Sequence, residues 1–403
     1  MQSYQETRRV HRALIIGGGI AGPATALALR RAGIDSVVYE AHRESIDDIG
    51  ALLAIAPNGL AALRILGADG ALQALGQPIR TMVIADGRGK KIGEFPGLAG
   101  LPPSLAVSRS QFAGALRGQA VAEGIRFECG KRLVAADEAP DGVVARFADG
   151  STATGDILIG ADGIRSVVRT VIDPRAPEPV RVPLLNFGAV ANVGVDARTD
   201  AMHFVFGDGG FFGYWLQADG RTAWFSNLPS ATLMTSAEAR AVPADRWLQR
   251  LRDAYAHDEP ARTVLRHTAA DQLVVLGSME IMPSLPHWHR GRIVLVGDSA
   301  HAPSSSSGQG ASLAIESAVE LARCLRDIPD TTGAFVAYER LRRSRVERVA
   351  ARAAKTNHGK ALGPTARTFM RLLMPIATRT FLNPERTLGA EQRYRIDWSE
   401  LVV

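Results

Sequence analysis

The chain has 403 residues, of which 46% are hydrophobic and 22% charged, and these proportions exclude a disordered or collagen-like protein. A formal net charge of +6 is a modest surplus over a large surface, so no nucleic-acid partner is required. Cys129 and Cys324 are far apart and have no histidines at ligand spacing, which predicts a reduced, cytoplasmic protein without a metal site. Arg8 and Arg9 precede only a short apolar run that glycines interrupt, so we expect neither a signal peptide nor a stable membrane association.

The first predicted unit is a strand, a helix and a second strand. An apolar strand at 12–16 runs into Gly17-x-Gly19-x-x-Gly22, an alanine- and leucine-rich helix follows, and the second strand ends at Glu40. Such glycines let the backbone N–H groups of a helix start approach a pyrophosphate, and the acidic residue can accept a hydrogen bond from a ribose hydroxyl. The sequence therefore predicts an α/β, Rossmann-like dinucleotide-binding fold.

The next segments are predicted to complete this fold. Residues 51–67 indicate a loop followed by a short packed helix. The spacing of Ser108 and Gln111 is that of a capping box, which places Arg109 in a first helical turn. Short alternating strands over 125–160, separated by turn signals, predict a β-meander that returns to the main sheet.

Two further motifs carry acidic residues at strand ends. Asp162 and Gly163 follow an apolar strand, and on local chemistry alone Asp162 either caps the next helix or belongs to a cofactor site. Gly297 and Asp298 follow a second apolar strand and lead through a serine-rich loop to a helix that starts at Gly310. Asp298 can accept a hydrogen bond from a polyhydroxylated chain, and the helix start can stabilise an anion.

Aromatic residues gather between 180 and 280 in strand-like segments, which predicts a second, mainly β domain. Because aromatic side chains can wall a dry pocket, we assign the substrate pocket to five residues: His203, Phe211, Phe212, Tyr214 and Trp224. His203, Tyr214 and His301 are conceivable proton carriers for a phenolic substrate, although ordinary packing is the preferred interpretation of each.

The chain beyond residue 331 is predicted to be helical to about residue 355, with short helices and turns around Pro364, Pro375 and Pro384. The basic run over 340–348 is interleaved with glutamates, so we interpret it as the solvated face of a helix and not as a polyanion site. The helix that starts at Gly310 is predicted to be amphipathic.

Taken in this order, the three motifs resemble those of the FAD-dependent aromatic hydroxylases, the single-component flavoprotein monooxygenases typified by para-hydroxybenzoate hydroxylase. The resemblance covers residues 12 to about 325. It implies a para-hydroxybenzoate hydroxylase-like fold with a discontinuous FAD-binding domain (1–75, 101–178 and 281–330), an inserted mainly-β substrate domain (76–100 and 179–280) and a C-terminal helical region (331–403).

The resemblance implies FAD as the cofactor and assigns residues to it: Gly17, Gly19, Ile20, Ala21, Gly22, Glu40, Arg43, Arg109, Asp162, Gly163, Gly297, Asp298, Gly310, Ala311 and Ser312. It also implies a loop and helix start at the catalytic edge of the flavin, formed by Pro303, Gly308, Gln309 and Gly310. Many relatives have asparagine where this chain has Ser312, and an acidic residue where it has Ser317. Because no second GxGxxG follows, NAD(P)H is expected to reduce the flavin by transient docking.

The implied activity is hydroxylation of an aromatic or polyketide-like small molecule by O2 through a flavin C4a-hydroperoxide, in biosynthesis or catabolism. An epoxidase or an antibiotic-inactivating hydroxylase would share these motifs. A halogenase is disfavoured because no WxWxIP segment is present. An oxidase is disfavoured because the chain has the motifs at Asp162-Gly163 and Gly297-Asp298. The alternative from another class is a non-catalytic FAD-binding redox sensor.

Overall fold

The computed structural model describes residues 10–43, 52–360 and 384–403. A six-stranded sheet forms its dinucleotide-binding part, and its neighbouring strands are parallel except for the first pair. Its order is β18 (His289–Arg290), β19 (Ile293–Leu295), β12 (Ile157–Gly160), β1 (Arg12–Ile16), β2 (Asp35–Glu40) and β8 (Arg126–Cys129). The predicted strand–helix–strand opening is confirmed.

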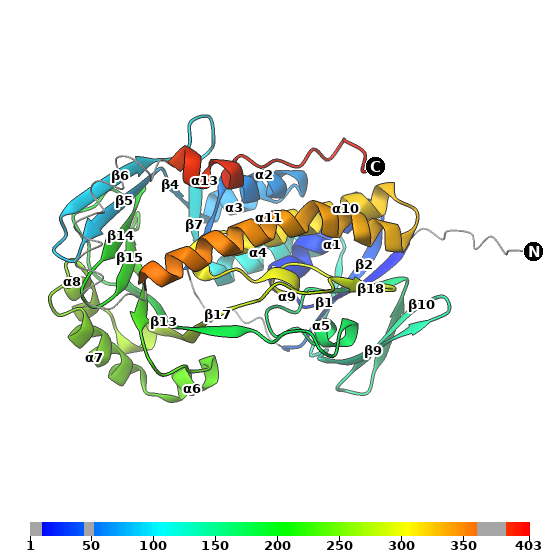
Figure 1. Ribbon diagram of the computed structural model, residues 1–403, viewed down its shortest axis with the longest axis horizontal. Coiled ribbons are helices and arrows are strands. Elements are labelled where there is room, and N and C mark those ends of the chain that lie inside the picture. The colour runs from blue at the N-terminus through cyan, green and yellow to red at the C-terminus, as the bar shows by residue number, and fades with distance from the viewer. Residues whose placement is uncertain (1–9, 44–51, 361–383) are drawn as a thin grey trace, which may run out of the picture.

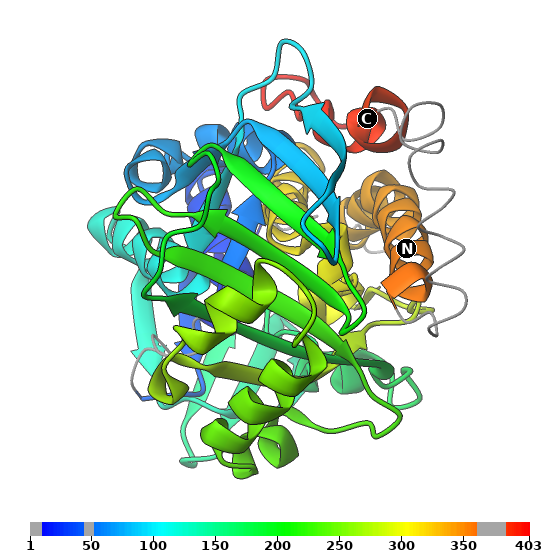
Figure 2. The same cartoon turned by 90° about the vertical axis from the view of Figure 1, so that its left-hand side faces the viewer.

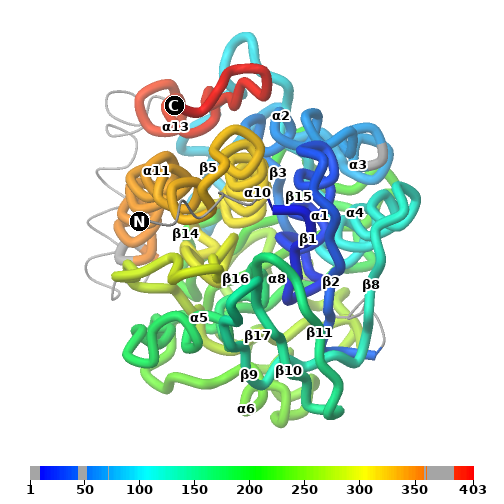
Figure 3. The backbone as a smooth tube through the Cα atoms, turned by 90° about the vertical axis from the view of Figure 1, so that its right-hand side faces the viewer, coloured from blue at the N-terminus to red at the C-terminus, as the bar shows by residue number. Residues whose placement is uncertain are grey.

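Both faces of this sheet are covered, which is why its central strands are continuously apolar (Figure 1). On one face α1 packs against α4 and α10, and on the other a three-stranded meander contacts β1 and β12 (Figure 3). The helices are α1 (Ala21–Arg31), α4 (Arg109–Ala122), α5 (Val167–Ile172) and α10 (Gly310–Asp327). The predicted meander consists of β9 (Leu133–Ala139), β10 (Gly142–Phe147) and β11 (Thr152–Gly155).

A seven-stranded sheet forms the second part, and β5 and β6 from the first hundred residues join it. Its order is β17 (Val274–Ile281), β13 (Val180–Ala191), β16 (Thr222–Pro229), β15 (Phe211–Leu216), β14 (Ala201–Phe206), β5 (Thr81–Asp86) and β6 (Lys91–Pro96). Figure 2 views the face that the following helices cover: α6 (Ser236–Ala241), α7 (Ala244–Ala254), α8 (Ala261–Arg266) and the 3-10 turn η1 (Ala270–Gln272).

A small antiparallel sheet lies between these two parts and corrects one prediction. It contains β3 (Leu52–Ile55), β7 (Ser104–Ser108) and β4 (Gln77–Ile79), so residues 52–55, predicted as part of a loop before the helix, form a strand. The apolar segment of β3 pairs with residues 105–108 of β7, which sequence periodicity alone did not reveal. The helices α2 (Pro57–Ile65) and α3 (Asp69–Leu75) follow it.

The predicted capping box is absent. Ser108 is the N-cap of α4, but its side chain makes no cap hydrogen bond and instead contacts the hydroxyl of Ser110 at 2.8 Å. Arg109 nevertheless opens the helix, as expected.

The C-terminal helices are α11 (Thr331–Lys360), which lies against α10, and α13 (Pro384–Gln392), which contacts α2. They are preceded by α9 (Asp298–His301) and the 3-10 turn η2 (Ser305–Ser307). The helix α10 is buried on all sides from Ser312 to Leu325 and is therefore not amphipathic as predicted, because α1, α2 and α11 surround it. Pro364 and Pro375 lie outside the described residues. In the described part of the chain, no helix is long and apolar enough to cross a membrane.

Candidate cofactor and substrate site

The glycines of the first motif divide into two kinds. Gly17 has a φ of 107°, a Cβ there would overlap the carbonyl oxygen of Ala161, and a Cβ at Gly22 would overlap that of Gly17. These two glycines allow close packing of the turn. Gly19 differs, because a Cβ there would meet no atom within 4 Å, so its backbone faces open space where a ligand can approach.

The N-terminus of α1 borders this open space. Ile20 is its N-cap and Ala21 its first residue, with no side-chain cap and no acidic residue in the first turn. The free N–H groups and the positive end of the helix dipole are therefore available to an anion such as a pyrophosphate.

The carboxylate of Glu40 is fixed at the end of β2. It accepts hydrogen bonds from the backbone N–H of Gly18 at 2.7 Å and of His42 at 2.9 Å. A carboxylate has about four lone-pair sites, so Glu40 can still accept from a ribose hydroxyl. Arg43 is exposed nearby, with its side chain beside Gly130.

Asp162 helps to cap the next helix, α5, whose N-cap residue is Ser166. Its carboxylate accepts from the hydroxyl of Ser166 at 2.6 Å and from the N–H groups of Val167 and Val168 at 2.7 and 3.1 Å. Burial raises the pKa of Asp162, and these hydrogen bonds oppose the rise. Gly163 has a φ of 77° and open space at its Cβ position. The Asp162 side chain therefore fixes the turn before α5, and the adjoining Gly163 has open space beside its backbone.

The third motif lies beside the first. A Cβ at Gly297, whose φ is 67°, would lie 2.8 Å from the Cβ of Ala21, so the start of α9 packs directly on the start of α1. Burial raises the pKa of Asp298, and the positive charge of Arg109 lowers it. Arg109 of α4 and Asp298 of α9 therefore lie close enough in the fold for their charges to interact.

A serine-rich loop runs from Pro303 to the start of α10, and α11 holds it. The Ser304 hydroxyl donates to Asn357 Oδ1 at 2.9 Å, and Arg352 donates to the Ser307 carbonyl at 3.2 Å. Gly308 has a φ of 61°, and a Cβ at Gly308 or Gly310 would meet no atom within 4 Å.

The helix α10 then begins without a side-chain cap on Gln309 and without an acidic residue in its first turn. The loop and the following residue, Ala311, therefore present backbone donors that suit the anionic N1–C2=O edge of a reduced flavin.

The two departures from the family pattern have partners within the chain. Ser312 accepts from the N–H of Ala56 at 3.2 Å, and a Cβ at Gly59 would meet its side chain, so a small residue fits here. Ser317 contacts His301 Nε2 at 2.9 Å and accepts from Arg342 Nε at 3.2 Å.

His301 is a packing residue. Burial and the charge of Arg342 lower its pKa to about 3, so the imidazole is neutral at physiological pH. Its ring lies 5.3 Å from that of Trp288. The preferred interpretation from the sequence, ordinary packing, agrees with this environment.

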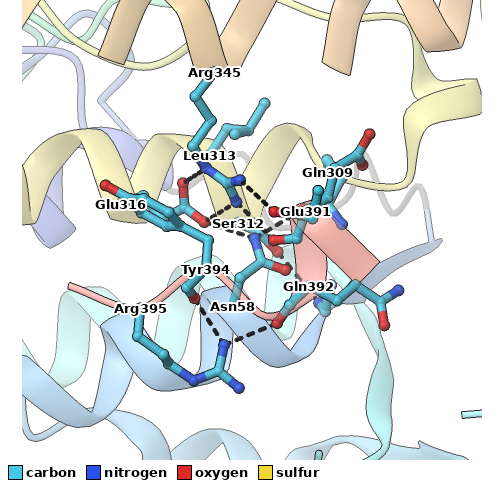
Figure 4. A network of polar contacts seen from close by, with 12 residues as sticks. Asn58, Gln309, Ser312, Leu313, Glu316, Arg345, Glu391, Gln392, Tyr394 and Arg395 are labelled. Atoms are coloured by element: carbon cyan, nitrogen blue, oxygen red, sulfur yellow. Dashed lines mark hydrogen bonds and ion pairs between the residues drawn. The ribbon is translucent and has the colours of Figure 1, made fainter. Parts of the chain in front are cut away.

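A buried ionic network underlies the loop (Figure 4). Glu316 of α10 contacts Arg342 at 2.7 Å and Arg345 at 2.7 Å. Asn58 donates to Glu316 at 2.7 Å and to the side-chain carbonyl of Gln309 at 2.9 Å. The network therefore connects α11 and α2 to the residue that precedes α10.

This network corrects the interpretation of the basic run as a solvated face. Arg342 and Arg345 are 0% and 5% exposed, because they point at Glu316 on the neighbouring helix. Only part of the run, including Arg340 and Arg348, is exposed.

The predicted pocket residues lie on two faces of the large sheet. Phe212, Tyr214 and Trp224 pack in the core beneath α7 and α8. The Trp224 indole donates to Thr268 at 3.0 Å, and the His203 ring stacks on that of Tyr214 at 4.7 Å. These four side chains therefore face the helices that cover the sheet, and their contacts are those of a core.

Phe211 is on the opposite, inner face, because successive strand residues alternate. Its ring centroid lies 5.6 Å from that of Phe204 and 5.9 Å from that of Phe225. Phe204 and Phe225 pack beside a small core that includes Ala106 of β7. The inner face also carries Asn227, which accepts from the Lys360 ammonium at 2.8 Å. Phe204 and Phe225 belong to the aromatic segment that the sequence predicted, whereas neither Asn227 nor Lys360 was predicted as a site residue.

Comparisons with known proteins agree with this geometry. The FAD binding domain family matches residues 11–353. An aurachin C monooxygenase/isomerase of Stigmatella aurantiaca is 31% identical over 82% of this chain and 84% of its own. An FAD-dependent urate hydroxylase of Klebsiella pneumoniae is 29% identical over 90% and 94%. The crystal structure of Klebsiella pneumoniae HpxO complexed with FAD and uric acid superposes with a TM-score of 0.82 at 25% identity, over 95% of this chain and 96% of that chain.

The chain therefore belongs to the FAD binding domain family, with the fold of the para-hydroxybenzoate hydroxylase-like flavoproteins. It is an FAD-dependent monooxygenase, and NAD(P)H is the reductant typical of that family.

Proposed function

We propose that this monooxygenase hydroxylates a planar aromatic small molecule, held between the inner face of the seven-stranded sheet and the loop before α10. The observation that carries the proposal is the aromatic wall of Phe204, Phe211 and Phe225 on that face. This wall lies where the seven-stranded sheet meets the loop before α10, because Lys360 contacts both Phe211 of the sheet and Ser306 of the loop. Such a wall excludes water and stacks on flat rings.

The names of similar proteins support an aromatic substrate. They include a 3-amino-4-hydroxybenzoate 2-monooxygenase of Streptomyces cremeus and a 6-hydroxynicotinate 3-monooxygenase of Pseudomonas fluorescens, 30% and 28% identical over 85% and 84% of this chain. We transfer from them the class of substrate and not its identity.

We assign the cofactor to the residues predicted from the motifs, and keep the predicted division into domains. When bound, FAD supplies the activation of O2 after reduction. In this assignment the backbone at Gly19 to Ala21 holds the pyrophosphate, and Glu40 holds the ribose. Asp298 and Arg109 orient the ribityl chain of FAD, which leads to the flavin ring. The backbone donors at the start of α10 stabilise negative charge on the flavin edge.

Anaerobic mixing of the FAD-loaded protein with NADPH or NADH, with and without a series of hydroxylated aromatic compounds, tests the proposal. We expect reduction that an aromatic ligand accelerates. When isotopically labelled O2 is then added to the reduced protein, we expect its oxygen in the product, read by mass spectrometry. The product also separates hydroxylation from epoxidation. A bound flavin that neither nicotinamide cofactor reduces would contradict the proposal and favour an oxidase or a redox sensor.

A pair of matched substitutions tests which sheet face binds the substrate. We expect Phe225→Leu to raise the KM of an active aromatic compound and to cost less than about 1 kcal/mol of unfolding free energy, because Phe225 is only half-buried. Phe212→Leu should cost about 1–3 kcal/mol, because it opens a fully buried core, and should leave KM unchanged. The reverse pattern in KM would place the substrate beneath α7 and α8.

A further inference from the structure

Lys360, the last residue of α11, is buried where the large sheet meets the loop before α10. The residue is 7% exposed. The amine donates to Asn227 Oδ1 at 2.8 Å and to the Ser306 hydroxyl at 3.0 Å, and lies 3.6 Å from the ring centroid of Phe211. One amine therefore contacts the aromatic wall and the loop assigned to the flavin edge.

Among the described residues, the polar groups that contact this amine are neutral. Asn227 is itself positioned by a hydrogen bond of 2.6 Å to Asn186, which fixes its carbonyl oxygen toward the lysine. In the described part of the chain, the recorded contacts of Lys360 Nζ include no carboxylate. An ammonium that is buried without a counter-ion costs free energy, and burial accordingly lowers the pKa of Lys360 to about 7.

A hydrophobic residue would fill this position without that cost, so the amine is better explained by a ligand that supplies the missing anion. We propose that Lys360 recognises an ionisable ring hydroxyl of the aromatic substrate, accepts its proton and pairs with the resulting ring oxyanion. The inference rests on the proposed function and narrows its substrate class to phenols and enolic heteroaromatic rings.

The proton transfer is balanced within the pair. The O–H bond of the substrate breaks and an N–H bond forms on Nζ, so a neutral amine and a neutral phenol become an ammonium and a phenolate, with no change in oxidation state. The phenolate ring is richer in electrons than the phenol, which suits attack by an electrophilic oxygen. Asn227 and Ser306 then keep the ammonium in place.

Equilibrium dialysis of the oxidised, FAD-loaded protein against 4-nitrophenol and its methyl ether, 4-nitroanisole, tests the proposal without turnover. We expect the wild-type protein to bind 4-nitrophenol at least about tenfold more tightly than 4-nitroanisole. Lys360→Met should abolish this preference while the affinity for 4-nitroanisole stays unchanged. Lys355→Met is the matched control, since Lys355 is exposed on the same helix, and should behave as wild type.

FAD content and thermal unfolding show whether Lys360→Met is folded, and Lys360→Gln replaces it if it is not. A folded Lys360 variant that keeps the preference, or a wild-type protein that binds both compounds equally or binds neither, would overturn the proposal. The dialysis needs neither NAD(P)H nor O2. If NAD(P)H reduces the flavin normally but the protein shows no preference for 4-nitrophenol, only the role of Lys360 is contradicted. If the preference is present but the flavin is not reduced, only the proposed hydroxylation is contradicted.

Discussion

Replacing Glu316 by glutamine should lower the free energy of unfolding by about 3–5 kcal/mol, although the side chain keeps its shape. The carboxylate is 1% exposed and faces two buried guanidinium groups, those of Arg342 and Arg345. Burial alone would raise the pKa of Glu316, and these two charges outweigh it and hold that pKa below its ordinary value. Removing the negative charge leaves both guanidinium groups buried without compensation.

Chemical denaturation of the wild-type and Glu316→Gln proteins measures this loss. Because the folded-state pKa is depressed, the contribution of Glu316 is complete above the ordinary value of 4.5 and disappears as the pH falls below it. The control is Glu347→Gln, which removes a carboxylate 45% exposed that pairs with Arg343 at 3.3 Å, and it should cost less than about 1 kcal/mol. Equal losses in the two variants would show that the buried network contributes no more than a surface pair.

Gly22→Ala should yield a protein that does not retain FAD, whereas Gly19→Ala should fold normally and bind FAD at least about tenfold more weakly. A Cβ at Gly22 meets the Gly17 carbonyl oxygen, so the turn and the start of α1 must move apart. A Cβ at Gly19 meets no protein atom within 4 Å, and only a ligand in that space would contact it.

The two alanine variants are compared by flavin content after purification and by thermal unfolding after removal of FAD. The unfolding free energy of flavin-free Gly19→Ala should lie within about 0.5 kcal/mol of wild type, so its loss of FAD affinity reports on the ligand alone. If Gly19→Ala bound FAD with wild-type affinity, the assignment of the pyrophosphate to this position would be wrong.

The dinucleotide-binding fold could be predicted because its signals are local. A strand, a glycine turn and an acidic residue at the end of the next strand lie within the segment from Arg12 to Glu40. The choice between a cap and a ligand for Asp162 was open in the sequence, since a carboxylate at a helix start serves either purpose. The structure gives Asp162 the hydrogen bonds of a cap.

The two errors with most bearing on function concern side chains whose partners are distant in sequence. Arg342 and Arg345 follow the same periodicity as solvated arginines, and only the packing of α11 on α10 brings Glu316 to them. Neighbouring strand residues such as Phe211 and Phe212 cannot both face one pocket. Gly213, where a Cβ would meet the ring of Phe225, was a local sign that aromatic rings crowd the face that holds Phe211.

The tethering of the loop before α10 by Arg352 and Asn357 also orders events during synthesis of the protein. A nascent chain that has been translated only as far as α10 already contains every strand of both large sheets. It still lacks the residues of α11 that fasten the loop. A ribosome-bound chain can therefore position the residues assigned to the pyrophosphate and the ribose first. The loop assigned to the flavin edge is fastened only after the last turns of α11 have left the ribosome.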